Sequence, residues 1–176
     1  MSSLLPNRGQ AIELLRENHC SSQVISHCVA VADLALETAN RLLEKGLKVD
    51  VELVEAGALL HDLGRSKNHT VEHGLIGAQI GQSVGLPESV VNIIKRHVGG
   101  GITVEEAKRF GWPKDIYSPH TLEEKIVCYA DKLIDHSKRV PIEFEIERLQ
   151  RENKVEAAER VRKLNEEITS LLGNKP

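Results

Sequence analysis

The chain has 176 residues, of which 40% are hydrophobic, 28% charged and 3% aromatic, as in a one-domain helical protein packed with Leu, Ile, Val and Ala. A net charge of −3 and an isoelectric point near 6.2 exclude a strongly basic surface, so no DNA or RNA duplex is expected as a partner. Three scattered cysteines, no signal-peptide pattern at residues 1–10 and no long apolar run predict a cytoplasmic protein without a membrane partner.

Helical spacing of apolar residues predicts the first two elements. A short helix is expected over residues 8–18 and a longer one over residues 22–43. In the second helix, His27 lies three residues after Val24 and four before Val31. It therefore shares their apolar side and is expected to point into the core.

The third helix should begin at Asp50 as its N-cap and run into an adjacent histidine and aspartate. Residues 56–60 have almost no polar side, which indicates a segment buried on most faces. Gly64 is expected to end it. Burial of a charged Asp62 at this place costs several kcal/mol of folding free energy unless a cation or hydrogen bonds compensate the charge. The adjacent His61 needs a partner for the same reason.

Two more helices follow a polar loop at residues 65–70. The first, at about 71–84, carries His73 on the face of its buried apolar residues. The second is predicted from Pro87 to His97, and His97 follows an apolar stripe at helical spacing. Both histidines are therefore expected to point inward.

A short helix is expected from Thr103 to Phe110 and a strong one from Thr121 to about Lys138. Asp131 lies on the apolar face of the second of these helices. A second carboxylate is thus placed on a buried surface.

Beyond Pro141 the pattern fits either a strand or a helix, and a helix is preferred because a lone strand would have no partner. Apolar residues at 4-3-4-3 spacing over 157–171 then predict a narrow seam that packs on one other helix, in the same chain or in a second copy. We expect a helical domain at 1–140, a C-terminal helical extension at 141–176 that packs on the domain or on a dimer partner, and a homodimer as the slightly favoured assembly.

Six titratable side chains lie on apolar stripes or at the ends of buried ones. Any one of them is best explained as a hydrogen-bonded core residue or a helix cap. Together they favour a divalent transition metal, because imidazole and carboxylate suit Mn, Fe, Co or Zn, as one ion or two. The six are His27, His61, Asp62, His73, His97 and Asp131.

The series His27, His61-Asp62-Leu63-Gly64 and Asp131 resembles the HD superfamily of metal-dependent phosphohydrolases in its HDIG form. The likeness covers about residues 22–136. His73 and His97 resemble the larger ligand set of two-metal members, which include diadenosine tetraphosphate hydrolases and cyclic-dinucleotide phosphodiesterases. Segments around His97 and Asp131 are also similar to small archaeal HDIG proteins without a settled substrate.

The resemblance implies an all-α HD-domain helical bundle. His27, His61, Asp62 and Asp131 would bind one metal ion, and Asp62 would bridge to a second. It further implies that a metal-activated hydroxide attacks phosphorus and that Asp62 is the catalytic residue that orients it. The expected substrate is a small, nucleotide-like phosphorylated molecule that is cleaved at a phosphoester or phosphoanhydride. Nucleotidase, phosphodiesterase and dinucleoside polyphosphate hydrolase activities remain open.

Residues near the motif are candidates for substrate binding. Arg65 and Lys67 are placed to neutralise phosphates, although solvated loop charges are the alternative. Lys132 points about 100° away from Asp131 on a helix and is expected at the rim. His69 and His120, in loops, are either general acids, late metal ligands or exposed residues without a role.

Two departures from the motifs of the family narrow the choice among its branches. No Gly-Tyr-Pro motif follows the histidines, which argues against the cyclic-di-GMP branch. Arg65 and Lys67 stand where many one-metal nucleotidases have an acidic residue, which favours two metals. The rival interpretations are a non-catalytic metal-binding HD module with a signalling or partner-binding role and a purely structural helical bundle.

Overall fold

The structure is a computed structural model that describes residues 4–173, so residues 1–3 and 174–176 of the two predicted domains lie outside it. Within the described span the chain forms nine α-helices, two short 3-10 helices and a two-stranded hairpin, which confirms the all-α class. The elements are α1 (Arg8–Glu17), α2 (Ser22–Glu44), α3 (Val51–Leu60), η1 (Leu63–Ser66), α4 (His73–Ser83), α5 (Glu88–Arg96), η2 (Val98–Gly100), α6 (Val104–Arg109), α7 (Leu122–Lys132), β1 (Ile134–Asp135), β2 (Lys138–Arg139), α8 (Ile142–Arg151) and α9 (Val155–Leu171).

Helices α3, α6 and α7 begin at the predicted capping residues. The side chains of Asp50, Thr103 and Thr121 each accept a hydrogen bond from the backbone N–H three residues later. At Thr103 and Thr121 the glutamate at that position bonds back to the capping residue and completes a capping box. Caps of this kind contribute about 1 kcal/mol each. They fix where each helix starts and hence which of its residues face inward.

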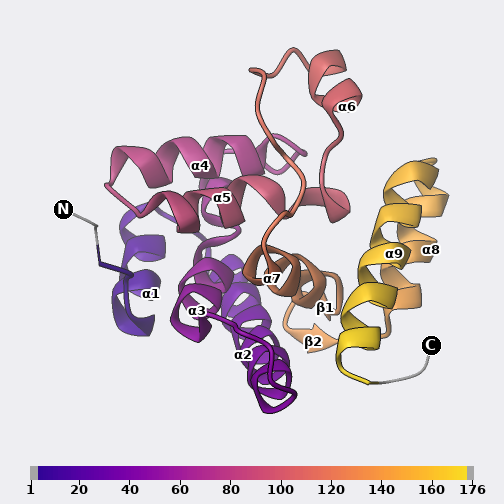
Figure 1. Ribbon diagram of the computed structural model, residues 1–176. Helices are drawn as coiled ribbons and strands as arrows, with labels where there is room; N and C mark the ends of the chain where they lie inside the picture. The colour runs from indigo at the N-terminus through magenta and orange to yellow at the C-terminus, as the bar shows by residue number, and fades with distance from the viewer. Residues whose placement is uncertain (1–3, 174–176) are drawn as a thin grey trace.

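Helix α3 lies in the middle of the bundle and packs against α1, α2, α5 and α7 (Figure 1). Val54 and every residue from Ala56 to Leu60 are buried, as predicted from their lack of a polar side. Gly57 allows α5 to come close, since a Cβ there would lie 2.4 Å from Cδ1 of Ile93. The chain leaves the core at the end of α3, where His61 and Asp62 lie.

The expectation that Gly64 ends this helix is wrong. Helix α3 already ends at Leu60, and Gly64 lies inside η1. Its role is close packing, because a Cβ at Gly64 would lie 1.9 Å from the carbonyl oxygen of His73 and 2.6 Å from the backbone nitrogen of Gly77. The glycine thus lets η1 rest directly on the backbone of α4.

The prediction that the seventh helix continues to about Lys138 is also wrong. Helix α7 ends at Lys132, and the chain turns into the β1–β2 hairpin, where Ile134 pairs with Arg139. His136 occupies the turn with φ = 54°, a left-handed conformation that no helix continues. An apolar Ile134 suits a helix and a strand equally, so the sequence pattern did not reveal the change. The preferred helix after Pro141 is confirmed as α8.

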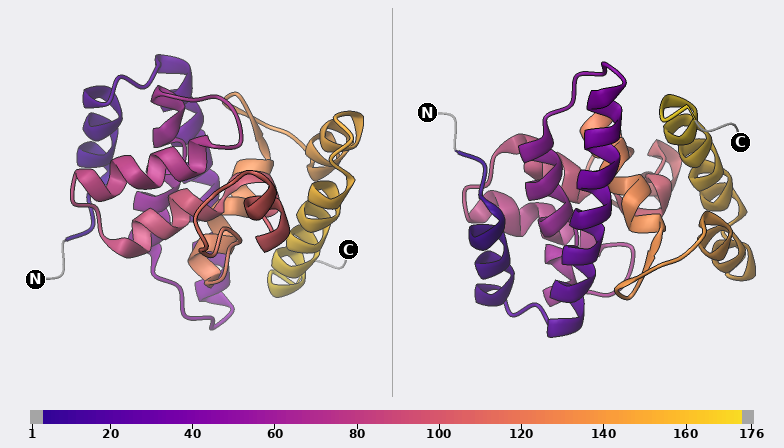
Figure 2. Two further views of the ribbon diagram at one scale, coloured as in Figure 1. Left: turned by 90° about the horizontal axis from the view of Figure 1, so that it is seen from above. Right: turned by 90° about the horizontal axis from the view of Figure 1, so that it is seen from below.

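Helices α8 and α9 form an antiparallel pair at one side of the molecule (Figure 2). They share a small core of their own, and α9 also packs against α7 and η2. Leu164 and Ile168, two members of the predicted seam, belong to the main core. The seam is therefore covered within one chain, and the homodimer stays a prediction without structural support.

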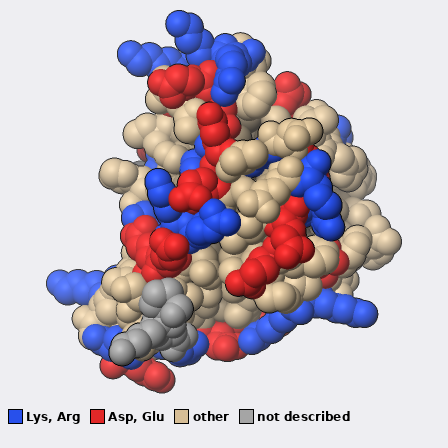
Figure 3. Space-filling view, turned by 90° about the vertical axis from the view of Figure 1, so that its right-hand side faces the viewer, with Lys and Arg blue, Asp and Glu red and all other residues tan. Residues whose placement is uncertain are grey.

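The outer face of the α8–α9 side carries interspersed acidic and basic side chains (Figure 3). On α9, Arg162 forms a helical ion pair with Glu159, and both side chains are exposed. An exposed pair of this kind contributes little to stability. Among the described residues, no helix has both the length and the apolar character needed to cross a membrane.

Candidate metal centre

The fold brings all six predicted titratable residues together. They come from the second turn of α2, the C-terminal ends of α3, α5 and α7, and the first residue of α4. His61, Asp62, His73 and His97 are at most 4% exposed. The side chains of His27 and Asp131 are 16% and 13% exposed and face an open cavity. Burial of so many polar groups at one place requires a shared partner.

The first group of side chains surrounds Asp131. Oδ1 of Asp131 lies 3.0 Å from Nε2 of His27 and 3.3 Å from Nε2 of His61. Oδ2 of Asp62 lies 3.7 Å from Nε2 of His61 and 3.8 Å from Nε2 of His27. The potential ligand atoms of His27, His61 and Asp131 are all within 4.8 Å of one another, a spacing that suits one metal ion.

The second group surrounds the other oxygen of Asp62. Oδ1 of Asp62 lies 3.2 Å from Nε2 of His73 and 3.4 Å from Nε2 of His97. The two Nε2 atoms are 3.0 Å apart. The carboxylate of Asp62 therefore presents one oxygen to each group of histidines.

Hydrogen bonds fix the orientation of each imidazole ring. Nδ1 of His61, His73 and His97 donates to the carbonyl oxygens of Ala58, Thr70 and Ile94, at 2.6 to 2.7 Å. A carbonyl oxygen can only accept, so the hydrogen of each neutral ring lies on Nδ1 and the lone pair lies on Nε2. His27 is held in the same way by the carbonyl oxygen of His136 at 2.7 Å.

This arrangement leaves lone pairs facing each other at the centre. Nε2 of His73 and His97 meet at 3.0 Å, and Nε2 of His61 and Oδ1 of Asp62 are buried without a hydrogen-bond partner. Such contacts are repulsive unless a cation lies among them. The donor set of neutral imidazoles and carboxylates therefore fits divalent transition metals, and backbone anchors of this kind are typical of metal-ligating histidines.

The pKa values of the groups match this role. Burial raises the pKa of Asp62, but the electrostatic interaction with His61 and the contacts with His73 and His97 outweigh it, and the net pKa lies well below its usual value. Burial also raises the pKa of Asp131, and Lys132 with His61 brings it well below its usual value. Burial lowers the pKa of His97 to about 4. At neutral pH both carboxylates are ionised and His97 is neutral, as metal ligands must be.

His97 makes the metal-free protein sensitive to acid. Its pKa is about 4 in the folded chain against 6.5 ordinarily, so between these values the unfolded chain binds more protons. Stability from this group is present above pH 6.5 and is lost as the pH falls towards 4. Between pH 7 and pH 5 we expect the unfolding free energy of EDTA-treated protein to drop by about 2 kcal/mol more than that of His97→Gln, as measured in urea. Equal drops in the two proteins would contradict this.

Two cations predicted to bind substrate lie beside the carboxylates. Nε of Arg65 donates to Oδ2 of Asp62 at 3.1 Å, and its Nη1 donates to the carbonyl oxygen of His69. Lys132 is 8% exposed and its Nζ forms an ion pair with Oδ2 of Asp131, so the expected rim position is wrong. The pairing places a positive charge against each of the two aspartates of the candidate metal groups.

The other candidates lie farther from the centre. Lys67 and His120 are exposed and do not line the cavity, whereas His69 does. Nothing in these positions tests a role for Lys67 in substrate binding, which stays a prediction. His69 is the better placed of the two loop histidines because its backbone already contacts Arg65.

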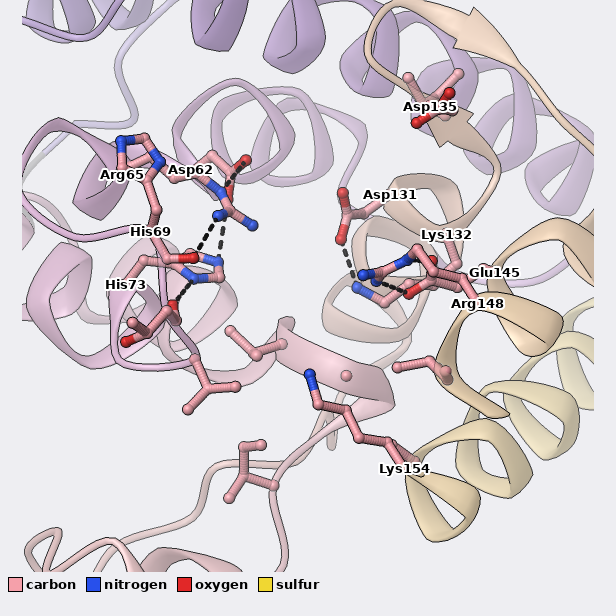
Figure 4. A pocket seen from close by; sticks show the side chains of 18 of the residues that line it. Asp62, Arg65, His69, His73, Asp131, Lys132, Asp135, Glu145, Arg148 and Lys154 are labelled. Atoms are coloured by element: carbon pink, nitrogen blue, oxygen red, sulfur yellow. Dashed lines mark hydrogen bonds and ion pairs between the residues drawn. The ribbon is translucent and has the colours of Figure 1, made fainter. Parts of the chain in front are cut away.

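A cavity of about 1000 Å³ opens over both groups of histidines. Figure 4 shows Asp62, Arg65 and His73 on one wall and Asp131, Lys132, Glu145 and Arg148 on the other. Sequence reasoning missed Glu145 and Arg148 of the second wall, because α8 follows a turn that the helical pattern concealed. The anchoring carbonyls of Thr70 and His136 were also missed, and backbone atoms leave no signal in a sequence.

The all-helical fold and the clustered histidines and aspartates define a protein equipped to bind divalent metals. Residues 24–134 match the family model of the HD domain, so the chain belongs to the HD domain family. It is 46% identical over 165 residues to the uncharacterized protein MJ0778 of Methanocaldococcus jannaschii, with 93% of this chain and 97% of that protein covered.

Two further kinds of relative are larger proteins. The chain is 35% identical over 169 residues to a tRNA (cytidine(56)-2′-O)-methyltransferase of Picrophilus torridus, which covers 96% of this chain but 48% of that protein. It therefore spans about half of the methyltransferase. A ribonuclease Y of Acidothermus cellulolyticus is 31% identical over 140 residues, with 77% of this chain and 24% of that protein covered.

The fold is also found in solved structures. The HD domain of the L. monocytogenes phosphodiesterase PgpH in complex with cyclic-di-AMP superposes with a TM-score of 0.56 at 17% identity, covering 93% of this chain and 95% of that one. The HD domain described without that ligand gives a TM-score of 0.53 at 18% identity. Identity at this level establishes a shared fold.

Proposed function

We propose that this protein is a metal-dependent phosphohydrolase that cleaves a phosphoester or phosphoanhydride in a small nucleotide-like substrate. The observation that carries the proposal is the position of Asp62, whose two oxygens face two separate groups of histidine nitrogens. We assign His27, His61, Asp62 and Asp131 to one ion. The second ion is assigned to Asp62, His73 and His97.

The chain's own residues would prepare the substrate for attack. Two divalent ions, when bound, would supply the Lewis acidity that polarises a phosphoryl group and makes water nucleophilic at neutral pH. Asp62, already ionised by its surroundings, orients the attacking water by accepting its hydrogen bond. Arg65 and Lys132 line the cavity and are placed to neutralise phosphate oxygens. The buried walls around His61 and His97 limit the access of competing water.

The relatives support a phosphate ester of a nucleotide as substrate. The names of two of them, ribonuclease Y and the PgpH phosphodiesterase, describe enzymes that act on phosphodiesters, and PgpH is seen with cyclic-di-AMP. The cavity of this chain, at about 1000 Å³, is at the upper end of the usual size for small-molecule sites. A phosphodiester is therefore the substrate type that we favour over a small monoester.

A second candidate function follows from the methyltransferase relatives. About half of each of these proteins resembles nearly all of this chain, which suggests that an HD module can accompany a different activity. In this alternative the domain binds metal and a nucleotide without turnover and assists a partner. The alternative predicts nucleotide binding without hydrolysis.

A metal and substrate panel tests the proposal. Purified protein stripped with EDTA and reloaded with Mn, Fe or Co should hydrolyse at least one linear or cyclic dinucleotide, and elemental analysis should find two ions per chain. His73→Asn should reduce the count to one, because it removes a ligand of the second group alone. A wild-type count of one that His73→Asn leaves unchanged would refute the second ion. Absence of hydrolysis with every metal and substrate would refute the proposal that the protein is an enzyme.

A further inference from the structure

We infer that the α8–α9 hairpin is the part of the site that recognises the nucleoside, with Phe144 stacking on a base and with Arg148 and Lys154 binding a phosphate that is not attacked. The inference rests on the proposed function. It concerns a segment that lies beyond the residues matched by the HD family model, which end at 134. The substrate it defines is a dinucleotide or the end of an oligonucleotide.

Helix α8 has two distinct faces. Ile142, Ile146 and Leu149 are buried and form a small core with α9. Phe144 and Arg148, four residues apart, line the cavity together. The hairpin is thus held by one face and presents the other to the space above the metal ligands.

Phe144 is an unusual residue at this place. The chain contains two phenylalanines, and both line this cavity and remain exposed, Phe144 by 39% and Phe110 by 45%. A large aromatic side chain normally contributes most to the stability of the fold when it is buried in the core. An exposed ring on a cavity wall instead offers a flat apolar surface, which every nucleobase can stack on.

The cations of the hairpin are placed to bind an anion. Figure 4 shows the side chain of Lys154 reaching into the cavity between the two walls that carry Arg65 and Arg148. Its Nζ donates to Glu152, which leaves two further N–H groups. Arg148 donates once each from Nε, Nη1 and Nη2 to Glu145 and Glu152, so one hydrogen on each terminal nitrogen remains. A phosphate can accept these remaining hydrogens from both side chains.

The walls of the cavity hold different charges for different parts of one ligand. Arg65 and Lys132 each pair with a carboxylate of the metal groups, so they serve the phosphate at the centre. Arg148 and Lys154 pair with glutamates of the hairpin itself. Two phosphate positions and a base-stacking ring in one cavity describe a ligand with two nucleotide units.

Equilibrium binding tests the inference independently of turnover. A linear dinucleotide with a phosphorothioate linkage is titrated by calorimetry into Mn-loaded wild type, Phe144→Leu and Lys154→Gln. We expect Phe144→Leu to raise the Kd about tenfold, the loss of one stacked base. Lys154→Gln should raise the Kd for the dinucleotide more than that for a nucleoside monophosphate. The matched controls are Ile116→Ala and Arg151→Gln, exposed residues that do not line the cavity, and they should leave both values unchanged.

Turnover separates this inference from the proposed function. Thymidine 5′-(p-nitrophenyl phosphate) and methyl p-nitrophenyl phosphate share a leaving group, and the second lacks a base. Phe144→Leu should lower the ratio of their kcat/KM values about tenfold. If Phe144→Leu is active and leaves the ratio of kcat/KM values unchanged, or if it leaves the dinucleotide affinity unchanged, this inference is overturned and the proposed function is not. Binding that depends on Phe144 without any hydrolysis would uphold the inference and overturn the proposed function. Absence of dinucleotide binding by wild type would overturn the inference.

Discussion

Asp62→Asn is expected to leave a folded protein that loses metal from both groups and more than about 100-fold in phosphohydrolase activity. The amide is the same size as the carboxylate but cannot present a negative oxygen to His61 on one side and to His73 and His97 on the other. Loss of a residue that only orients a metal ligand typically costs 10- to 100-fold, so the loss of a shared ligand should exceed that range.

The matched control for this change is Asp135→Asn. Asp135 lines the same cavity but makes no contact with the histidines among the contacts of the described residues. Elemental analysis and the dinucleotide assay should therefore show wild-type behaviour for the control, and circular dichroism should show a helical fold for both variants. Retention of two ions per chain by Asp62→Asn would contradict the shared-ligand assignment.

The sequence predicted the inward-facing residues well because helices carry that information locally. His27 shares the apolar side of α2, and Asp131 shares that of α7, so their spacing alone placed them in the core. The predicted caps, such as Thr121, fixed the helix starts to within a residue or two. That the six residues converge on one site was inferred from the number of inward-facing residues and from their chemical type. The fold confirms that they meet.

What the sequence did not reveal depends on contacts between distant segments. The turn at His136 follows a stretch whose pattern fits a helix, yet the carbonyl oxygen of that residue orients His27, 109 residues earlier in the chain. The part of the second wall formed by Glu145 and Arg148 likewise requires that the chain brings α8 back to the cavity after the β1–β2 hairpin. Neither feature has a local pattern, because each arises from the path of the backbone in three dimensions.

Gly64 shows how a motif residue can be recognised for the wrong reason. It was expected to end a helix, whereas its φ is not positive and it sits within η1. Its hydrogen atoms face the backbone of α4 at the point where His73 begins that helix. The glycine of the motif therefore sets the distance between Asp62 on one side and His73 on the other.

Gly64→Ala is accordingly expected to reduce the unfolding free energy by about 3 kcal/mol or more and to remove the second metal ion. The new Cβ would lie 1.9 Å from the carbonyl oxygen of His73 and 2.6 Å from the backbone nitrogen of Gly77, and neither backbone atom can rotate away. Helix α4 must shift as a whole, so His73 moves away from Asp62. Urea unfolding of the EDTA-treated protein measures the first effect, and elemental analysis of the reloaded protein measures the second.

The control is Gly9→Ala, at an exposed position of helix α1. A Cβ there meets Oδ1 of Asn7 at 3.5 Å, an ordinary contact, and alanine favours a helix over glycine by up to about 1 kcal/mol. Gly9→Ala should thus be neutral or stabilising and keep both ions. If Gly64→Ala were as stable as wild type and kept two ions, then α4 would not be held against η1, and the distance between Asp62 and His73 would have to be set by the metal ions themselves.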